Sequence, residues 1–110
     1  MRPFTIRFHT VSYGPNPKRP RLIWATGQTP KAVRNVQSLL ENALQKHQML
    51  HPLLLHMTLA RFRAEDFGQF KIKQVHEHVS WQDEIHAIVL MKSHLLRSGA
   101  EYEVLEKFSL

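Results

Sequence analysis

One apolar stripe at helical spacing interrupts a chain that otherwise alternates with period two, and this contrast limits the folds open to it. The stripe consists of Ala32, Val33, Val36, Leu39, Leu40, Ala43 and Leu44. Residues three and four apart share one face of a helix, so an amphipathic helix is predicted up to about Gln48. Thr29 is expected to be its N-cap, with Pro30 at the first helical position. One clear helix among strands predicts an α+β fold.

Most of the remaining chain has strand character. The predicted strands are 4–9, with Phe4, Ile6 and Phe8 facing inward, 21–26, 53–62, 84–91 and 101–108. Residues 63–68 are predicted as a loop, and Ser98-Gly99 is predicted as a turn before the last strand. The segment 84–91 is apolar on both faces, which is typical of an inner strand of a sheet. Residues 13–20 contain three of the six prolines and predict a rigid, exposed, basic loop. The pattern of 69–79 fits either a short helix or a strand, and Trp24 in the second strand is expected to be a core anchor.

Length and composition predict one domain over residues 1–110. A chain of 110 residues with 43% hydrophobic content can build one core. No apolar run approaches the roughly 20 residues that span a bilayer, and no signal-peptide pattern is present, so we expect a cytoplasmic protein without membrane association. The absence of cysteine excludes disulfides, thiolate nucleophiles and cysteine-based metal sites.

The charge balance favours an anionic partner. Fifteen basic residues against nine acidic ones give a formal net charge of +6, which makes nucleic acid the natural candidate. Three of the cations, Lys18, Arg19 and Arg21, lie in or beside the predicted proline-rich loop. We expect these three side chains to attract and contact the phosphates of a nucleic acid.

The predicted strand 53–62 carries an imidazole and a hydroxyl two residues apart. Side chains alternate along a strand, so His56 and Thr58 point to the same side, whereas Leu55, Met57 and Leu59 are expected to face the core. A proton-transfer group beside a hydrogen-bond donor suits a reaction on a phosphate. Strict alternation puts Arg61 on the opposite face unless the strand twists or ends there.

No metal or cofactor site is predicted. His76 and His78 share a face only if their segment is a strand, and no convincing third ligand accompanies them. The four glycines are scattered singly, so no glycine-rich phosphate loop exists, and no serine lies in a glycine-flanked elbow.

The run His56-Met57-Thr58-Leu59-Ala60-Arg61 resembles the second His-x-Thr motif of the two-histidine phosphoesterases, specifically the LigT-like RNA 2',3'-cyclic phosphodiesterases, also called 2'-5' RNA ligases. Similar segments accompany it along nearly the whole chain at 3–4, 13–15, 19–24, 90–95, 99–102 and 105–110. They correspond only to the C-terminal half of the family. The first His-x-Thr motif is missing, because none of the other seven histidines is followed two places later by threonine.

The resemblance implies a single LigT-like lobe, an antiparallel sheet with one or two helices packed on one face and with His56 and Thr58 on the other. It also favours a helix over a strand for 69–79. It implies hydrolysis of 2',3'-cyclic phosphate ends of RNA, or 2'-5' ligation, without a metal. His56 is then the acid or base, Thr58 holds a non-bridging oxygen, and Arg61 supports the charge. Three alternatives stay open: a homodimer in which a symmetry copy replaces the lost first motif, a non-catalytic RNA- or nucleotide-binding lobe, and a fragment whose N-terminal partner lobe is separate.

Overall fold

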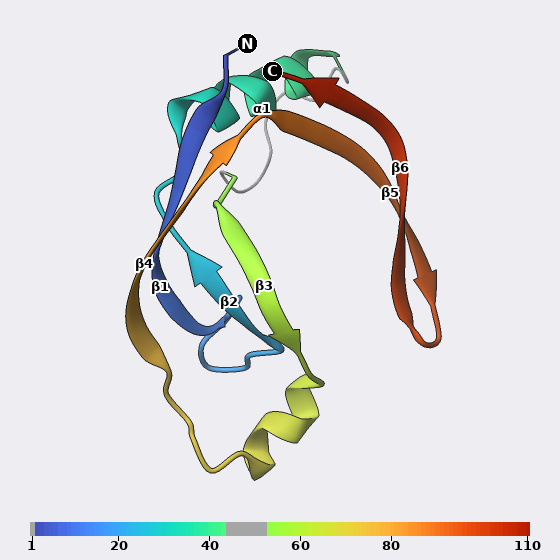
Figure 1. Ribbon diagram of the computed structural model, residues 1–110. Helices are drawn as coiled ribbons and strands as arrows, with labels where there is room; N and C mark the ends of the chain where they lie inside the picture. The colour runs from blue at the N-terminus through green and yellow to red at the C-terminus, as the bar shows by residue number, and fades with distance from the viewer. Residues whose placement is uncertain (1, 44–52) are drawn as a thin grey trace. The chain divides into compact units, whose positions relative to one another are not determined.

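The computed structural model describes residues 2–43 and 53–110, and these form a sheet-rich α+β chain. The elements are β1 (Phe4–Gly14), β2 (Leu22–Thr26), α1 (Lys31–Ala43), β3 (His56–Arg61), the 3-10 helix η1 (Ala64–Gln69), β4 (His76–Ile85), β5 (Ala87–Leu96) and β6 (Gly99–Ser109), as labelled in Figure 1. The contacts within the chain define two compact units. One comprises Ile6–Asp83, and the other joins Glu84–Leu110 to the first residues up to Thr5.

The larger unit is built on a four-stranded sheet in the order β3-β2-β1-β4. Strand β1 pairs antiparallel with β2 from Thr10 opposite Thr26 to Gly14 opposite Leu22, and β2 pairs antiparallel with β3. The predicted first strand is therefore confirmed but continues to Gly14. Its additional residues lie in the ladder with β2, so the proline-rich loop begins only at Pro15.

An aromatic cluster holds η1 against the end of the sheet. It consists of Tyr13, Phe62, Phe67 and Phe70, whose neighbouring rings meet edge-on at centroid separations of 4.8–6.0 Å. Pairs of this kind contribute about 0.5–1.5 kcal/mol each beyond the area they bury. The Tyr13 hydroxyl also donates a hydrogen bond to the Ile72 carbonyl at 2.7 Å, which fixes the segment that leads into β4.

Two predictions for this stretch fail. Residues 63–68, predicted as a loop, mostly form η1, and the weak preference for a helix within 69–79 is wrong because β4 begins at His76. The aromatic contact of Phe67 with Tyr13 holds η1, and pairing with β1 makes the segment from His76 onward a strand.

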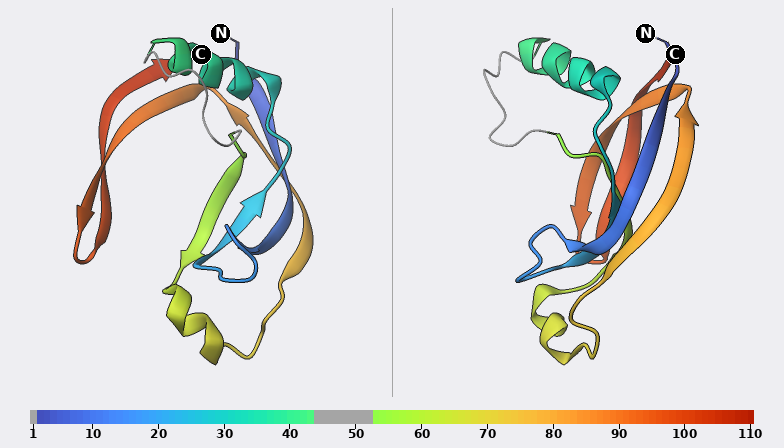
Figure 2. Two further views of the ribbon diagram at one scale, coloured as in Figure 1. Left: turned by 180° about the vertical axis from the view of Figure 1, so that it is seen from behind. Right: turned by 90° about the vertical axis from the view of Figure 1, so that its left-hand side faces the viewer.

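Helix α1 is confirmed, and its predicted end at Gln48 lies outside the described residues. The amides of Val33 and Arg34 both donate to the Pro30 carbonyl at 3.1 Å. The Thr29 side chain bonds elsewhere, as described below. Figure 2 shows α1 beyond the ends of β2 and β3.

None of the helices described is long and apolar enough to cross a membrane.

Strands β5 and β6 form an antiparallel hairpin, closed at a turn where Gly99 has φ of 125°. That conformation suits glycine, so the predicted turn at Ser98-Gly99 is confirmed. The prediction of an inner strand at 84–91 is wrong for the described chain, because β4 runs to Ile85 and β5 pairs with β6 alone. Large apolar side chains on both strands are exposed, most of all Leu95 at 86%.

Candidate functional site

Strand register gathers polar and aromatic side chains on one face of the four-stranded sheet. Residues directly opposite each other in an antiparallel ladder share a face. Two rows therefore cross β1, β2 and β3 side by side: Thr10, Thr26 and His56 form one, and Ser12, Trp24 and Thr58 form the other. His56 is exposed and Thr58 is half-buried. The imidazole and the hydroxyl singled out from the sequence thus lie on one face, beside residues from two other strands.

One hydrogen bond and one ring contact orient His56. Its Nδ1 lies 2.8 Å from the Leu54 carbonyl oxygen, and its ring centroid lies 5.1 Å from that of Trp24. A carbonyl oxygen can only accept, so Nδ1 is the protonated nitrogen. In the neutral ring Nε2 then carries the lone pair and can take a proton from a bound molecule.

A buried threonine fixes the segment that precedes His56. The Thr29 hydroxyl donates to the Leu53 carbonyl at 2.9 Å and accepts from the Leu55 amide at 3.0 Å. The Gly27 amide donates to the Leu55 carbonyl at 3.3 Å. Thr29 therefore orients the approach to His56 instead of capping α1. Its partners lie more than twenty residues away, so no local pattern indicates this role.

A β-bulge sets the position of Arg61. Ile23 lies opposite Ala60 and Trp24 opposite Thr58, which leaves Leu59 as the extra residue of β3. One extra residue reverses the phase of the alternation, so Arg61, opposite Leu22, returns to the face of His56 and Thr58. The expectation that Met57 and Leu59 face the core is wrong, because they are 41% and 45% exposed.

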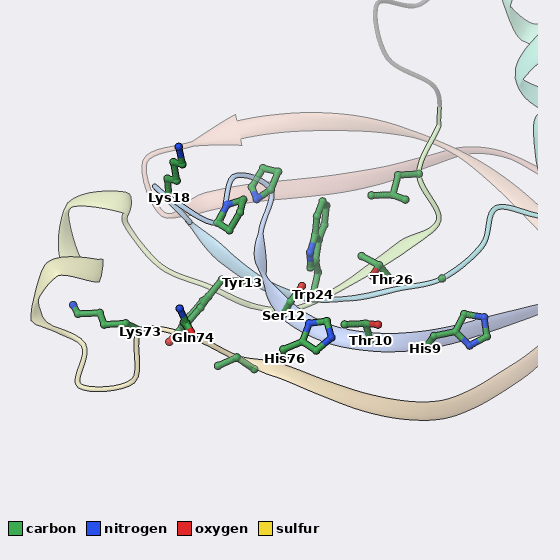
Figure 3. Close-up of a pocket in the computed structure, with 15 residues that line it drawn as sticks. His9, Thr10, Ser12, Tyr13, Lys18, Trp24, Thr26, Lys73, Gln74 and His76 are labelled. Atoms are coloured by element: carbon green, nitrogen blue, oxygen red, sulfur yellow. The ribbon is translucent and has the colours of Figure 1, made fainter.

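A groove of about 870 Å³ adjoins these residues (Figure 3). It is lined by His9, Thr10, Ser12, Tyr13, Pro15, Pro17, Lys18, Trp24, Thr26, Gly27, Leu54, Lys73, Gln74, Val75 and His76. This set includes cations and neutral polar groups but no acidic residue, which favours an anionic ligand. Sequence reasoning missed Trp24, treated as a core anchor, and His76, treated only as a candidate metal ligand.

The loop cations differ in position. Lys18 lines the groove, whereas Arg19 and Arg21 are exposed residues outside the lining set. Lys73, which the sequence did not single out, also lines it. The Lys73 ammonium donates to the Phe67 carbonyl at 2.5 Å and lies 4.8 Å from the centroid of the Phe67 ring. Its other N–H donors are not used by that bond.

The paired histidines of β4 have no third ligand for a metal among the residues that the structure describes. The rings of His76 and His78 meet edge-on at 5.3 Å, as expected for alternate residues of a strand. Within the described part of the chain, no three His, Cys, Asp or Glu side chains lie close enough together to hold a metal ion.

Comparison with known proteins finds a similarity to a solved structure. No family model matches the chain, and no curated protein matches it. The crystal structure of TT0787 of Thermus thermophilus is similar, with a TM-score of 0.67 and 29% sequence identity over 98% of this chain. The match covers 61% of TT0787, so the chain spans less than two thirds of the length of that protein.

Proposed function

We propose that the chain is a lobe of a LigT-like two-histidine phosphoesterase that acts on RNA ends as a 2',3'-cyclic phosphodiesterase or 2'-5' RNA ligase. The observation that carries the proposal is the arrangement of His56, Thr58 and Arg61 on one face of the sheet, with Arg61 brought there by the bulge. The groove beside them, free of acidic residues, is suited to RNA.

Hydrolysis of a 2',3'-cyclic phosphate needs two proton transfers. Water attacks phosphorus, one ribose oxygen leaves, a base takes the proton of the water and an acid protonates the leaving oxygen. His56, through Nε2, performs one of these transfers. The Thr58 hydroxyl donates a hydrogen bond to a non-bridging oxygen, and the Arg61 guanidinium offsets the charge that develops there.

The second transfer needs another proton-transfer group across the phosphorus atom, and the chain has only one His-x-Thr motif. His76 lies on β4, three strand positions from β3, or about 14 Å between the backbones. Two imidazoles so far apart do not flank one phosphorus atom. We therefore propose that the missing first His-x-Thr motif is replaced by a motif of a separate N-terminal lobe or of a second copy of the chain.

The test is hydrolysis of an oligoribonucleotide that ends in a 2',3'-cyclic phosphate. His56→Ala is expected to lower kcat by about 10²- to 10⁴-fold, the usual contribution of one positioned imidazole. His86→Ala is the matched control, because His86 is an exposed histidine of the other compact unit. Equal rates for the wild-type and His56→Ala chains contradict the proposal.

A second candidate is a non-catalytic lobe that binds RNA ends. The single His-x-Thr motif of the chain favours it. In that case the purified chain binds the cyclic-phosphate RNA, Thr58→Val weakens binding, and no product forms at any protein concentration. Turnover that depends on His56 excludes this second function.

A further inference from the structure

We infer that the groove beside Trp24 binds the terminal nucleoside together with the phosphate on its 5' side, so that the chain binds an oligoribonucleotide end in preference to a mononucleotide. The inference rests on the proposed function, because it takes His56 and Thr58 as the phosphate site. It adds the class of substrate and a set of residues that recognise it.

The groove is continuous with the surroundings of His56. Trp24 lines the groove, and its ring centroid lies 5.1 Å from that of His56. Thr26, the cross-strand partner of His56, and Leu54, whose carbonyl holds the imidazole, line it as well. A ligand with its phosphate at His56 therefore has its neighbouring part at the groove.

The walls match the parts of a nucleotide. Figure 3 shows the Trp24 ring among the lining residues, which include Pro15 and Pro17 and no carboxylate. Aromatic faces stack on any base, at about 1–3 kcal/mol per base. The hydroxyls of Thr10 and Ser12 can bond to ribose or base edges. Lys18 and His76 add groups that bind phosphate.

The size of the groove indicates more than a phosphate. At about 870 Å³ it falls in the range of sites that hold a whole small molecule. The lining reaches from β2, next to His56, across β1 to His76 on β4. That extent leaves His76 too distant for the phosphate at His56 but available to the next group along an RNA chain.

The fluorescence of Trp24 reports directly whether a ligand is bound in the groove. The chain has two tryptophans, so Trp81→Phe leaves Trp24 as the only one. In this variant, adenylyl-adenosine 2',3'-cyclic phosphate and adenosine 2',3'-cyclic phosphate are titrated while Trp24 fluorescence is followed. The dinucleotide is expected to bind at least tenfold more tightly. At equal ligand concentrations below saturation it is therefore expected to quench Trp24 fluorescence more strongly.

Two further variants locate the effect. His76→Gln and Lys18→Gln are expected to reduce the preference for the dinucleotide several-fold while leaving mononucleotide binding unchanged. Lys71→Gln, an exposed lysine outside the lining set, is the charge-matched control and is expected to keep the preference.

The two proposals fail separately. Equal affinities for the two ligands overturn the subsite even if His56-dependent hydrolysis occurs. A dinucleotide preference that depends on His76, without any hydrolysis, supports the subsite and contradicts the catalytic function. Binding of neither nucleotide also overturns the subsite.

Discussion

At the scale of single residues, His56 depends on contacts made before the strand begins. Its Nδ1 bonds to the Leu54 carbonyl, and Leu54 lies between the two residues that Thr29 holds. Thr29 is itself buried, so its hydroxyl has no water to replace these partners. The tautomer and direction of the imidazole therefore follow from a threonine far away in the sequence.

Thr29→Val is expected to lower the free energy of unfolding by about 1–3 kcal/mol, because the Leu55 amide and the Leu53 carbonyl both lose a partner. The rate of cyclic-phosphate hydrolysis should fall with it, as His56 loses its fixed orientation. Urea unfolding and the hydrolysis assay measure the two effects. Thr29→Ser keeps the hydroxyl and should stay close to the wild type. A valine variant as stable and active as the serine variant would show that the hydroxyl does not orient the site.

At the scale of elements, η1 positions one end of the groove. Its ring cluster and the bond from Tyr13 to Ile72 hold the chain just before Lys73 and His76 enter the lining. Phe67 is central, because it contacts the rings of Tyr13 and Phe70 and carries the carbonyl and the ring that meet the Lys73 ammonium.

Phe67→Ala is expected to cost about 2 kcal/mol of folding stability, less than the usual 3–5 kcal/mol for a fully buried phenylalanine because this one is half-buried. Binding of the dinucleotide should weaken as well, since Lys73 and His76 lose their anchor. Phe67→Leu retains most of the apolar volume and serves as the control. Thermal unfolding and Trp24 quenching report the two effects. If the alanine variant loses stability but binds the dinucleotide normally, η1 is a structural cap and does not shape the groove.

At the scale of the whole molecule, the chain carries half of what the proposed chemistry needs. It has one His-x-Thr motif, and it matches 61% of TT0787. A second copy related by a twofold axis can supply the missing histidine, and twofold dimers are the commonest oligomers.

If the active species is such a dimer, mixing wild-type and His56→Ala chains in equal amounts gives heterodimers with one histidine per cleft. At the same total chain concentration, activity is then expected to fall well below half of that of the wild type alone. Mass measurement at micromolar concentration checks that dimers form. A monomer at that concentration, or activity of one half in the mixture, rules out the shared site and leaves the separate lobe as the source of the missing motif.

The sequence by itself determined the features that depend on neighbours within one segment. The period-two pattern predicted that Phe4, Ile6 and Phe8 face inward, and they are buried or half-buried. The apolar stripe predicted α1, and glycine at position 99 predicted the hairpin turn. The same periodicity placed His56 and Thr58 on one side of their strand.

Tertiary structure decided whatever depends on a partner far along the chain. The bulge opposite Ile23 and Trp24 returned Arg61 to the face of His56, which alternation within β3 alone does not indicate. Thr29 bonds across to Leu53 and Leu55 instead of to its own helix. Trp24 lines a groove because β1 and β2 bring Ser12 and Thr26 beside it. The periodicity of the sequence indicates which side chains of one strand share a face. Pairing between strands decides which residues of other strands lie beside them.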